Sequence, residues 1–218
     1  MSKICFQIPY PTFIESIVVY FLLRYRKKHY DFAFRRIKLI ANEDVAPKHR
    51  YAIVDPEDYQ KLSKYPWLLL EGGSEIYYAG CFEHRKIVYM HRQIMNAPKG
   101  SIVDHRNREG LDNTKRNLRF ATHSQNCCNR IRTKNGSSKY RGVHYRKQER
   151  KWEASICYNG IYKYLGVFGN EEDAARAYDE DAKIYHGEFA VLNFGDNSEL
   201  AQIPSPNNII NSLAKEAV

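Results

Sequence analysis

The dipeptide Asn159-Gly160 lies between two runs of residues that have the character of β-strands. The run before it alternates apolar with polar side chains, in the order Trp152, Glu153, Ala154, Ser155, Ile156 and Cys157. Asn-Gly favours a two-residue turn whose central residues both have positive φ, and alternation with a period of two is typical of a strand with one buried face. The sequence therefore predicts an antiparallel hairpin over residues 151–168.

A helix is predicted directly after this hairpin. Asn170 suits the N-cap position, and three acids follow at 171–173, where negative charge interacts favourably with the helix dipole. Residues 171–186 carry an inner stripe of small and aromatic side chains: Ala174, Ala177, Tyr178, Ala182 and Tyr185. With a first strand over 139–146, the pattern predicts a small α+β domain, a three-stranded antiparallel sheet packed on one helix.

The first strand of this domain lies in a strongly basic part of the chain. Residues 130–151 hold nine Lys or Arg and one acid, a local net charge of +8, and the whole chain carries +9. Tyr140, Tyr145 and Trp152 lie among these charges and add flat aromatic surfaces. Positive charge alone would suit nucleic acid or an anionic membrane, and the interleaved aromatic residues favour nucleic acid.

The cysteines and the apolar runs indicate the interior of a cell. The five cysteines, an odd number, include no C-x-x-C pair, so neither a disulfide framework nor a zinc knuckle is predicted. The apolar run 17–23 is far shorter than the ~20 residues of a membrane span, and predicts a short buried helix over 17–25 instead. We expect a cytoplasmic protein without a membrane partner, associated with the nucleoid in a prokaryote or phage and nuclear in a eukaryote.

A second informative group of polar residues lies in the middle of the chain. Asp104-His105 follows a strand-like segment, and Asn117 and Asn126 come 13 and 22 positions after Asp104. Hydrolysis of a phosphodiester needs a base for water and a cation for the developing charge. Histidine suits the base, because its reference pKa of about 6.5 leaves it largely neutral near pH 7. One carboxylate and one Asn side-chain carbonyl are a minimal set of protein ligands for Mg²⁺.

This segment resembles the HNH endonuclease family, whose site is a ββα-metal hairpin and helix. The resemblance covers residues 85–130 and implies that Asp104 and Asn126 are metal ligands, that His105 is the general base and that Asn117 orients it. It also implies Mg²⁺ as the metal, with Mn²⁺ as an alternative, and no small-molecule cofactor. His91, in a family-like Met-His-Arg segment, is a second-tier candidate for a phosphate contact or a structural hydrogen bond.

The C-terminal domain resembles the Apetala-two/ethylene-response-factor domain over essentially its whole length. The matching pieces are Tyr140-Arg141-Gly142-Val143, Lys151-Trp152-Glu153-Ala154, Tyr164-Leu165-Gly166, 172–179 and Leu192-Asn193-Phe194. That family lays its sheet in the major groove, so the resemblance implies DNA contacts from Arg141, His144, Arg146, Trp152, Tyr162 and Tyr164. Cys157, His144 and the two Tyr stand where plant members usually carry Arg or Trp, so the plant target sequence is not implied.

These patterns divide the chain into five segments. They are an N-terminal extension of unassigned role at 1–34, an HNH module at 35–130 with its core at 85–130, a linker at 131–138, the Apetala-two-like domain at 139–195 and a flexible tail at 196–218. The linker assignment rests on composition, because Asn, Gly and Ser are frequent there. The predicted fold class is α+β in both modules.

The features together predict a site-specific, metal-dependent, homing-type endonuclease. The HNH module would cut double-stranded DNA, while the C-terminal domain would supply affinity and register. Two alternatives stay open at this point. The chain could be a non-catalytic, transcription-factor-like DNA-binding protein with a relic HNH module, or its basic aromatic surface could bind RNA.

Overall fold

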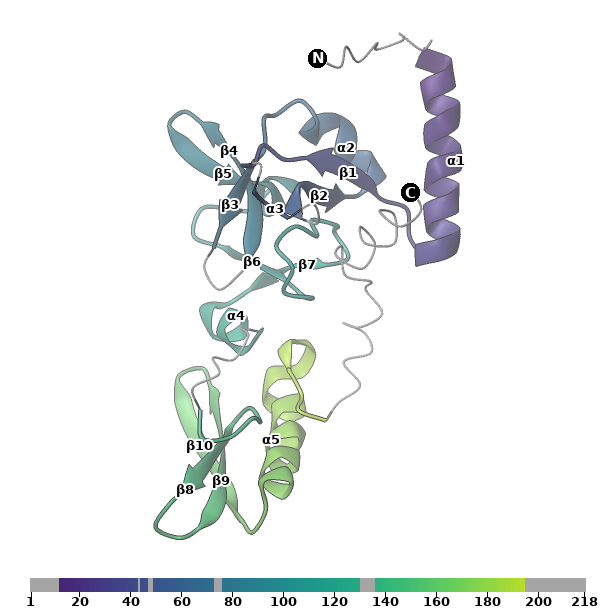
Figure 1. Cartoon of the computed structure of the whole chain (residues 1–218). Coiled ribbons are helices and arrows are strands. Elements are labelled where there is room, and N and C mark those ends of the chain that lie inside the picture. The colour runs from purple at the N-terminus through teal and green to yellow at the C-terminus, as the bar shows by residue number, and fades with distance from the viewer. Residues whose placement is uncertain (1–11, 43, 47–48, 73–75, 130–135, 195–218) are drawn as a thin grey trace.

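The computed structural model describes residues 12–42, 44–46, 49–72, 76–129 and 136–194 (Figure 1). Its elements are short helices and small antiparallel sheets, so the α+β class predicted from the sequence is confirmed. The predicted tail and most of the predicted linker lie outside the described residues. Within them, no helix is long and apolar enough to cross a membrane.

Helix α1 (Thr12–Tyr30) runs along one side of the N-terminal half (Figure 1). Its apolar side chains Ile17, Val18, Tyr20 and Phe21 are 50–63% exposed, so the prediction of a short buried helix is wrong. The last turn is anchored, because the buried guanidinium of Arg26 donates to the carbonyl oxygen of Phe34 at 2.5 Å. An apolar run predicts a helix but does not say what covers it.

Two small sheets build the body of the N-terminal half. Strand β1 (Arg35–Lys38) pairs antiparallel with β2 (Tyr51–Val54), and α2 (Pro56–Leu62) follows with Asp55 at its N-cap. Strands β3 (Leu68–Glu71), β4 (Tyr77–Glu83) and β5 (Lys86–Tyr89) form a second sheet that leads into α3 (Met90–Ile94). Their core is closed by fully buried Trp67, Leu62 and Met90.

A hairpin and a short helix follow on this body. Strand β6 (Ile102–His105) pairs antiparallel with β7 (Leu118–Ala121), and α4 (His123–Asn129) comes next, where Thr122 Oγ1 accepts from the Gln125 N–H. The long loop between the strands is attached to β2, because Ile53 N donates to Leu111 O and Asn113 N donates to Ile53 O, both at 2.8 Å. A polar loop is thereby fixed against a buried strand.

The C-terminal module is a three-stranded sheet on one helix. Strands β8 (Val143–Arg146), β9 (Lys151–Tyr158) and β10 (Ile161–Phe168) lie in the order β10-β9-β8, with α5 (Glu171–His186) and the 3₁₀ turn η2 (Gly187–Phe189) after them. Asn159 and Gly160 take φ of 50° and 79°, as the hairpin turn requires. The core is formed largely by alanines and Val143, which bring α5 close to the sheet.

The first strand of this sheet begins later than the sequence pattern indicates. The expected strand covers 139–146, whereas β8 starts at Val143. Gly142 has φ of +72°, and a Cβ there would lie 1.9 Å from Tyr178 Cδ2 and 2.7 Å from Ser155 O. The chain therefore turns at Gly142, and only glycine fits so close to α5 in this backbone conformation.

Candidate functional site

The β6–β7 hairpin brings an acid and an imidazole together at the end of β6. Asp104 lies opposite Arg119 in the ladder, and His105 lies opposite Leu118. Both side chains are buried, with 6% and 5% of their surfaces exposed. Helix α4 packs here through Asn129, whose Nδ2 lies 3.0 and 3.1 Å from the two carboxylate oxygens and 2.9 Å from His105 O. Two strands and a helix thus enclose one carboxylate and one histidine.

The Asp104 carboxylate has an unequal set of partners. Oδ2 accepts from both Nε and Nη2 of Arg119 at 2.9 Å, while Oδ1 is contacted by Asn129. Oδ1 of Asn129 is buried and has no hydrogen-bond partner within the described residues. Oxygen donors of these two kinds are the ligands that Mg²⁺ prefers. The residues therefore fit a divalent cation, held by Asp104 with an Asn carbonyl.

Acidic and imidazole ligands alone would not hold a cation here. No cluster of three or more His, Cys, Asp or Glu suited to a metal occurs in the described part of the chain. A cation at Asp104 therefore needs an amide oxygen, waters or a phosphate to complete its shell. That requirement is typical of a site that holds metal and nucleic acid together.

Burial keeps the imidazole of His105 neutral. Burial lowers its pKa to about 4, although Asn113 and the charge of Asp104 act in the opposite direction. This pKa lies below the reference value of about 6.5 on which the sequence expectation was based. Asn113 faces the ring, yet Nε2 of His105 and Oδ1 of Asn113 are buried atoms that form no hydrogen bond of ordinary geometry with described residues. A neutral imidazole can accept a proton at its unprotonated ring nitrogen.

His91 lies beside His105 as a second buried imidazole. The two rings meet edge to face with their centroids 5.0 Å apart, and the Tyr78 ring lies 5.8 Å from His91 and 5.9 Å from His105. Burial, then the neighbouring His105 and Arg92, lower the pKa of His91 to about 3. The second-tier candidate from the sequence is thus part of the same centre as His105.

The loop between β6 and β7 is a network of buried polar groups. Asn117 donates from Nδ2 to Asp112 O at 2.8 Å, and its Oδ1 accepts from Asn107 N at 3.0 Å. The Asp112 carboxylate accepts from Thr114 and Asn107, while burial raises its pKa to about 6. These bonds hold the loop in one shape between the two strands that carry Asp104 and His105.

The two faces of the C-terminal sheet differ in exposure. One face, here called the outer face, carries His144, Arg146, Glu153, Tyr162 and Tyr164. Arg146 pairs with Glu149 at 2.8 Å and Glu153 at 3.2 Å, and the Tyr162 hydroxyl donates to Glu153. Trp152 lies on the other face, where it packs with Tyr145 and the core under α5. Most of the predicted contact residues therefore share one exposed surface, but Trp152 does not.

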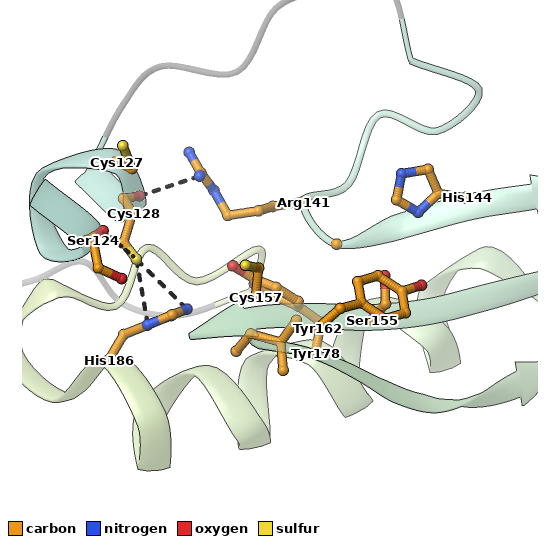
Figure 2. A pocket seen from close by; sticks show the side chains of 12 residues that line it. Ser124, Cys127, Cys128, Arg141, His144, Ser155, Cys157, Tyr162, Tyr178 and His186 are labelled. Atoms are coloured by element: carbon orange, nitrogen blue, oxygen red, sulfur yellow. Dashed lines mark hydrogen bonds between the residues drawn. The ribbon is translucent and has the colours of Figure 1, made fainter. Parts of the chain in front are cut away.

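Arg141 lies between the two modules. Its Nη1 donates to Cys128 O at the end of α4 at 3.2 Å, and Figure 2 shows the side chain pointing to that helix. Arg141 lines a pocket of about 340 Å³ between the modules. Residues of α4, β9 and α5 also line it, including Cys128, Cys157 and His186. Cys128 Sγ lies 3.3 Å from His186 Nδ1. Arg141 thus contacts α4 from the C-terminal module, and the DNA contact that the resemblance implies for it stays a prediction.

The turn η2 forms a second contact between the modules. Arg106 pairs with the Glu188 carboxylate at 2.6 Å, and Arg119 donates to the Glu188 carbonyl oxygen at 2.7 Å. The guanidinium carbon of Arg119 lies 3.5 Å from the centre of the Phe189 ring. The residue that binds Asp104 is therefore also bound by the C-terminal module.

No family model matches the chain. An uncharacterized HNH endonuclease of Acanthamoeba polyphaga mimivirus is 33% identical over 147 residues, which cover 67% of this chain and 76% of that protein. The chain belongs to the HNH endonuclease family.

A shorter part of this HNH family member is similar to plant proteins. An AP2-like ethylene-responsive transcription factor of Arabidopsis thaliana is 43% identical over 79 residues, 35% of this chain and 23% of the plant protein. APETALA2-like protein 2 of Oryza sativa is 49% identical over 61 residues, 27% of this chain and 14% of that protein. The matches span a quarter or less of each plant protein, so they concern one domain of it.

The asparagines of the HNH segment are arranged differently from the sequence expectation. Asn117 contacts the loop and not the imidazole, and Asn113 is the amide that faces His105. Asn126 lies half-buried on α4, one turn before Asn129, and it is Asn129 that contacts Asp104. The i, i+3 spacing of Asn126 and Asn129 was a usable signal, because it places both on one side of the helix. No local signal separates Asn113 from Asn107 or Asn117.

Proposed function

We propose that this protein is a metal-dependent, site-specific endonuclease that hydrolyses phosphodiester bonds of double-stranded DNA. The observation that carries the proposal is the pair formed by His105 and Asp104: a buried, neutral imidazole directly beside a buried carboxylate. The relation to an uncharacterized HNH endonuclease supports a nuclease. The relation to plant ethylene-responsive transcription factors supports DNA as the partner.

His105 acts as the general base in this proposal. Its Nε2 accepts a proton from the water that attacks phosphorus, and the positive imidazolium that results lies next to Asp104. Asn113 lies against the ring and limits its rotation. Burial favours the neutral ring before the reaction and the Asp104 charge favours the cation afterwards, so the residue is suited to both states.

Asp104, with Asn126 or Asn129 on α4, holds the divalent cation. These oxygen donors suit Mg²⁺, and Mn²⁺ accepts the same ligands. Such a cation, when bound, stabilises the charge that develops on the phosphate. Asn129 also positions the base relative to the metal ligand. It donates to the Asp104 carboxylate and to the His105 carbonyl oxygen, so the two residues keep a fixed separation.

The outer face of the C-terminal sheet binds the duplex in this proposal, by entering the major groove. His144, Arg146, Tyr162 and Tyr164 are exposed on it. Arg146 supplies positive charge for phosphate or for a guanine edge, and the Tyr side chains supply flat contact area with hydroxyl groups. Arg141 contributes to the junction of the modules, and Trp152 to the core of the sheet.

Cleavage mapping tests the proposal directly. Pure protein is incubated with a library of genomic fragments in Mg²⁺, in Mn²⁺ and in chelator, and the fragment ends are sequenced. We expect ends that cluster at one short sequence and that require metal. Asp104→Ala is the matched protein control, and it should bind DNA without producing ends. Metal-independent ends, or full cleavage by Asp104→Ala, would exclude the proposed site.

A non-catalytic DNA-binding role is the second candidate function. The observation in its favour is the ion pair in which Arg119 occupies Asp104 Oδ2 with two N–H groups. A carboxylate already neutralised in this way would suit a structural role. Sequence-specific binding without cleavage in any divalent metal would support this candidate over the nuclease.

A further inference from the structure

Arg119 is held on opposite sides by residues from the two modules. On one side, Nε and Nη2 donate to Asp104 Oδ2, both at 2.9 Å. On the other side, Nη1 donates to Glu188 O at 2.7 Å and the guanidinium lies over the Phe189 ring at 3.5 Å. Arg119 and Phe189 are buried, with 6% and 4% exposed. One side chain thus connects the candidate metal ligand to a turn of the C-terminal module that lies 69 residues after Arg119.

A buried guanidinium depends on all of these contacts. Burial disfavours its charge, and Asp104 and the Glu188 carboxylate oppose that effect on its pKa. The group presents five N–H donors in a rigid plane, so its orientation follows from where its acceptors lie. The Glu188 carbonyl and the Phe189 ring fix that plane from the C-terminal side. Without them, Arg119 would keep Asp104 as a partner but would lose the contacts that set its angle.

We propose that the η2 turn is a structural part of the nuclease centre, with Phe189 and the Glu188 carbonyl acting as positioning groups. They hold Arg119, and Arg119 holds Asp104 through Oδ2, so that Oδ1, which Asn129 also contacts, is the oxygen for the cation. The inference rests on the proposed function. It adds that the C-terminal module completes the cutting site, in addition to binding DNA. Residues that orient a metal ligand typically contribute 10–100-fold to metal affinity or activity.

The neighbouring ion pair allows two roles of η2 to be distinguished. One is to position Arg119, and the other is only to attach the two modules to each other. Arg106 and the Glu188 carboxylate pair at 2.6 Å, but both side chains are substantially exposed. Exposed pairs of this kind contribute little. Glu188→Gln removes that charge, including its longer contact of 3.7 Å with Arg119, and leaves the main-chain carbonyl for Arg119. If η2 only attached the modules to each other, loss of this pair and loss of the Phe189 ring would have similar consequences.

The experiment compares full-length wild type with Phe189→Ala, Phe189→Tyr and Glu188→Gln. Val191→Ala is the matched control, because Val191 is buried in the same segment. Three quantities are measured: Mn²⁺ affinity by electron paramagnetic resonance, DNA affinity by fluorescence anisotropy, and single-turnover cleavage. Phe189→Ala should lose about 10–100-fold in Mn²⁺ affinity and in cleavage, with DNA affinity unchanged. Phe189→Tyr keeps the ring and should restore both, and Val191→Ala should match the wild type. Glu188→Gln, which removes a carboxylate 3.7 Å from Arg119 but keeps the carbonyl and the ring, should lose less than Phe189→Ala.

The outcomes separate this inference from the proposed function. Wild type that binds Mn²⁺ but cuts no DNA would refute the nuclease, and the Mn²⁺ affinity of Phe189→Ala would still decide the inference. Equal Mn²⁺ affinity in Phe189→Ala and Val191→Ala would overturn the inference while cleavage by wild type upheld the nuclease. Wild type without any Mn²⁺ affinity would overturn both. If Phe189→Ala is unfolded by circular dichroism, Phe189→Leu takes its place, because it keeps apolar volume and lacks the ring.

Discussion

The nuclease centre and the outer face of the C-terminal sheet use polar side chains in opposite ways. Around Asp104 the polar groups are buried and are held by neighbours, as Asn117 is held by Asp112 and Asn107. On the outer face, Arg146 and Tyr162 are exposed and meet their partners at the surface. Removing one member of a buried network leaves its partner unpaired, whereas exposed contacts contribute separately. We therefore expect few, large effects in the first region and many, small effects in the second.

The two modules also differ in whether their core or site is formed by their own residues alone. The core clusters of the C-terminal module draw their members from residues 140–192, within that module. The nuclease centre receives Glu188 and Phe189 from outside its own module. The core of the C-terminal module thus comes from its own residues, whereas Arg119, the partner of Asp104, has contacts from both modules. The following predictions test this difference.

His105→Ala should have the largest effect. Single-turnover cleavage should fall roughly 10²–10⁴-fold, the usual contribution of a positioned base. DNA affinity should stay at the wild-type value, because His105 is buried away from the outer face. The matched control is His144→Ala on that face, which should weaken binding and leave the maximal rate unchanged. The reverse pattern in the two variants would show that the assignment of the two regions is wrong.

Asn117→Ala should lower stability and cleavage together. It leaves Asp112 O and Asn107 N without their partner, at about 1–3 kcal/mol for each buried group. Urea unfolding gives the change in free energy of unfolding. Asn126→Ala serves as the comparison, because Asn126 is half-buried on α4 and should affect metal-dependent cleavage with little change in stability. Equal stability of the two variants would argue against a loop held by Asn117.

Acid should destabilise the nuclease module through its two buried imidazoles. Burial lowers the pKa of His91 to about 3 and of His105 to about 4, so the folded state favours the neutral rings. Their stabilising contribution is complete above the unfolded value of about 6.5, and is lost as pH falls from there toward 4. Asp112, with its pKa raised to about 6, and Asp55, whose pKa burial also raises, act in the opposite direction, but the two histidines have the larger shifts.

The measurement is the urea midpoint at neutral pH and near pH 5. Wild type should lose stability over this interval. His91→Phe keeps a ring and removes one titrating group, so it should lose less. His144→Gln, on the exposed outer face, should behave as wild type does. A midpoint that does not change with pH in wild type would contradict the buried, neutral histidines.

Arg146→Ala should give the smallest effect. If Arg146 contacts one phosphate, its loss should reduce the log–log slope of affinity against salt by about 0.9. Anisotropy titrations at several salt concentrations give the slope, with maximal cleavage unchanged. Lys163→Ala is the matched control, since Lys163 pairs with Asp181 on the opposite side of the sheet. A slope that drops equally for both variants would mean that net charge, and not the outer face, sets the affinity.

The parts of the fold that sequence predicted are those fixed by neighbouring residues. Asn159-Gly160 forms the turn, and the Asn170 side chain accepts from Asp173 N at 2.8 Å as an N-cap. The alternation along β9 also placed Trp152 with Ala154 and Ile156, on the face that packs under α5. The contact role assigned to Trp152 by family resemblance conflicts with that alternation. Local pattern was the better guide to which face a residue occupies.

The parts that sequence could not give depend on contacts between distant segments. Asn113 reaches His105 because its loop is bonded to Ile53, 60 positions earlier. Arg141 lies on Cys128 O because α4 ends beside it, and Phe189 covers Arg119 because α5 ends beside the hairpin. None of these pairings leaves a periodic or compositional signal. The identity of the acid and the imidazole was readable from sequence, but the residues that hold them were not.

Helix α4 has a consequence for where DNA would be cut. Asn129 contacts Asp104, and the carbonyl of the preceding residue, Cys128, is bonded by Arg141 of the other module. The two attachments are one residue apart on a helix of seven residues. Cutting should therefore fall at a constant number of base pairs from the recognised sequence and in constant helical phase with it, whatever the intervening bases are.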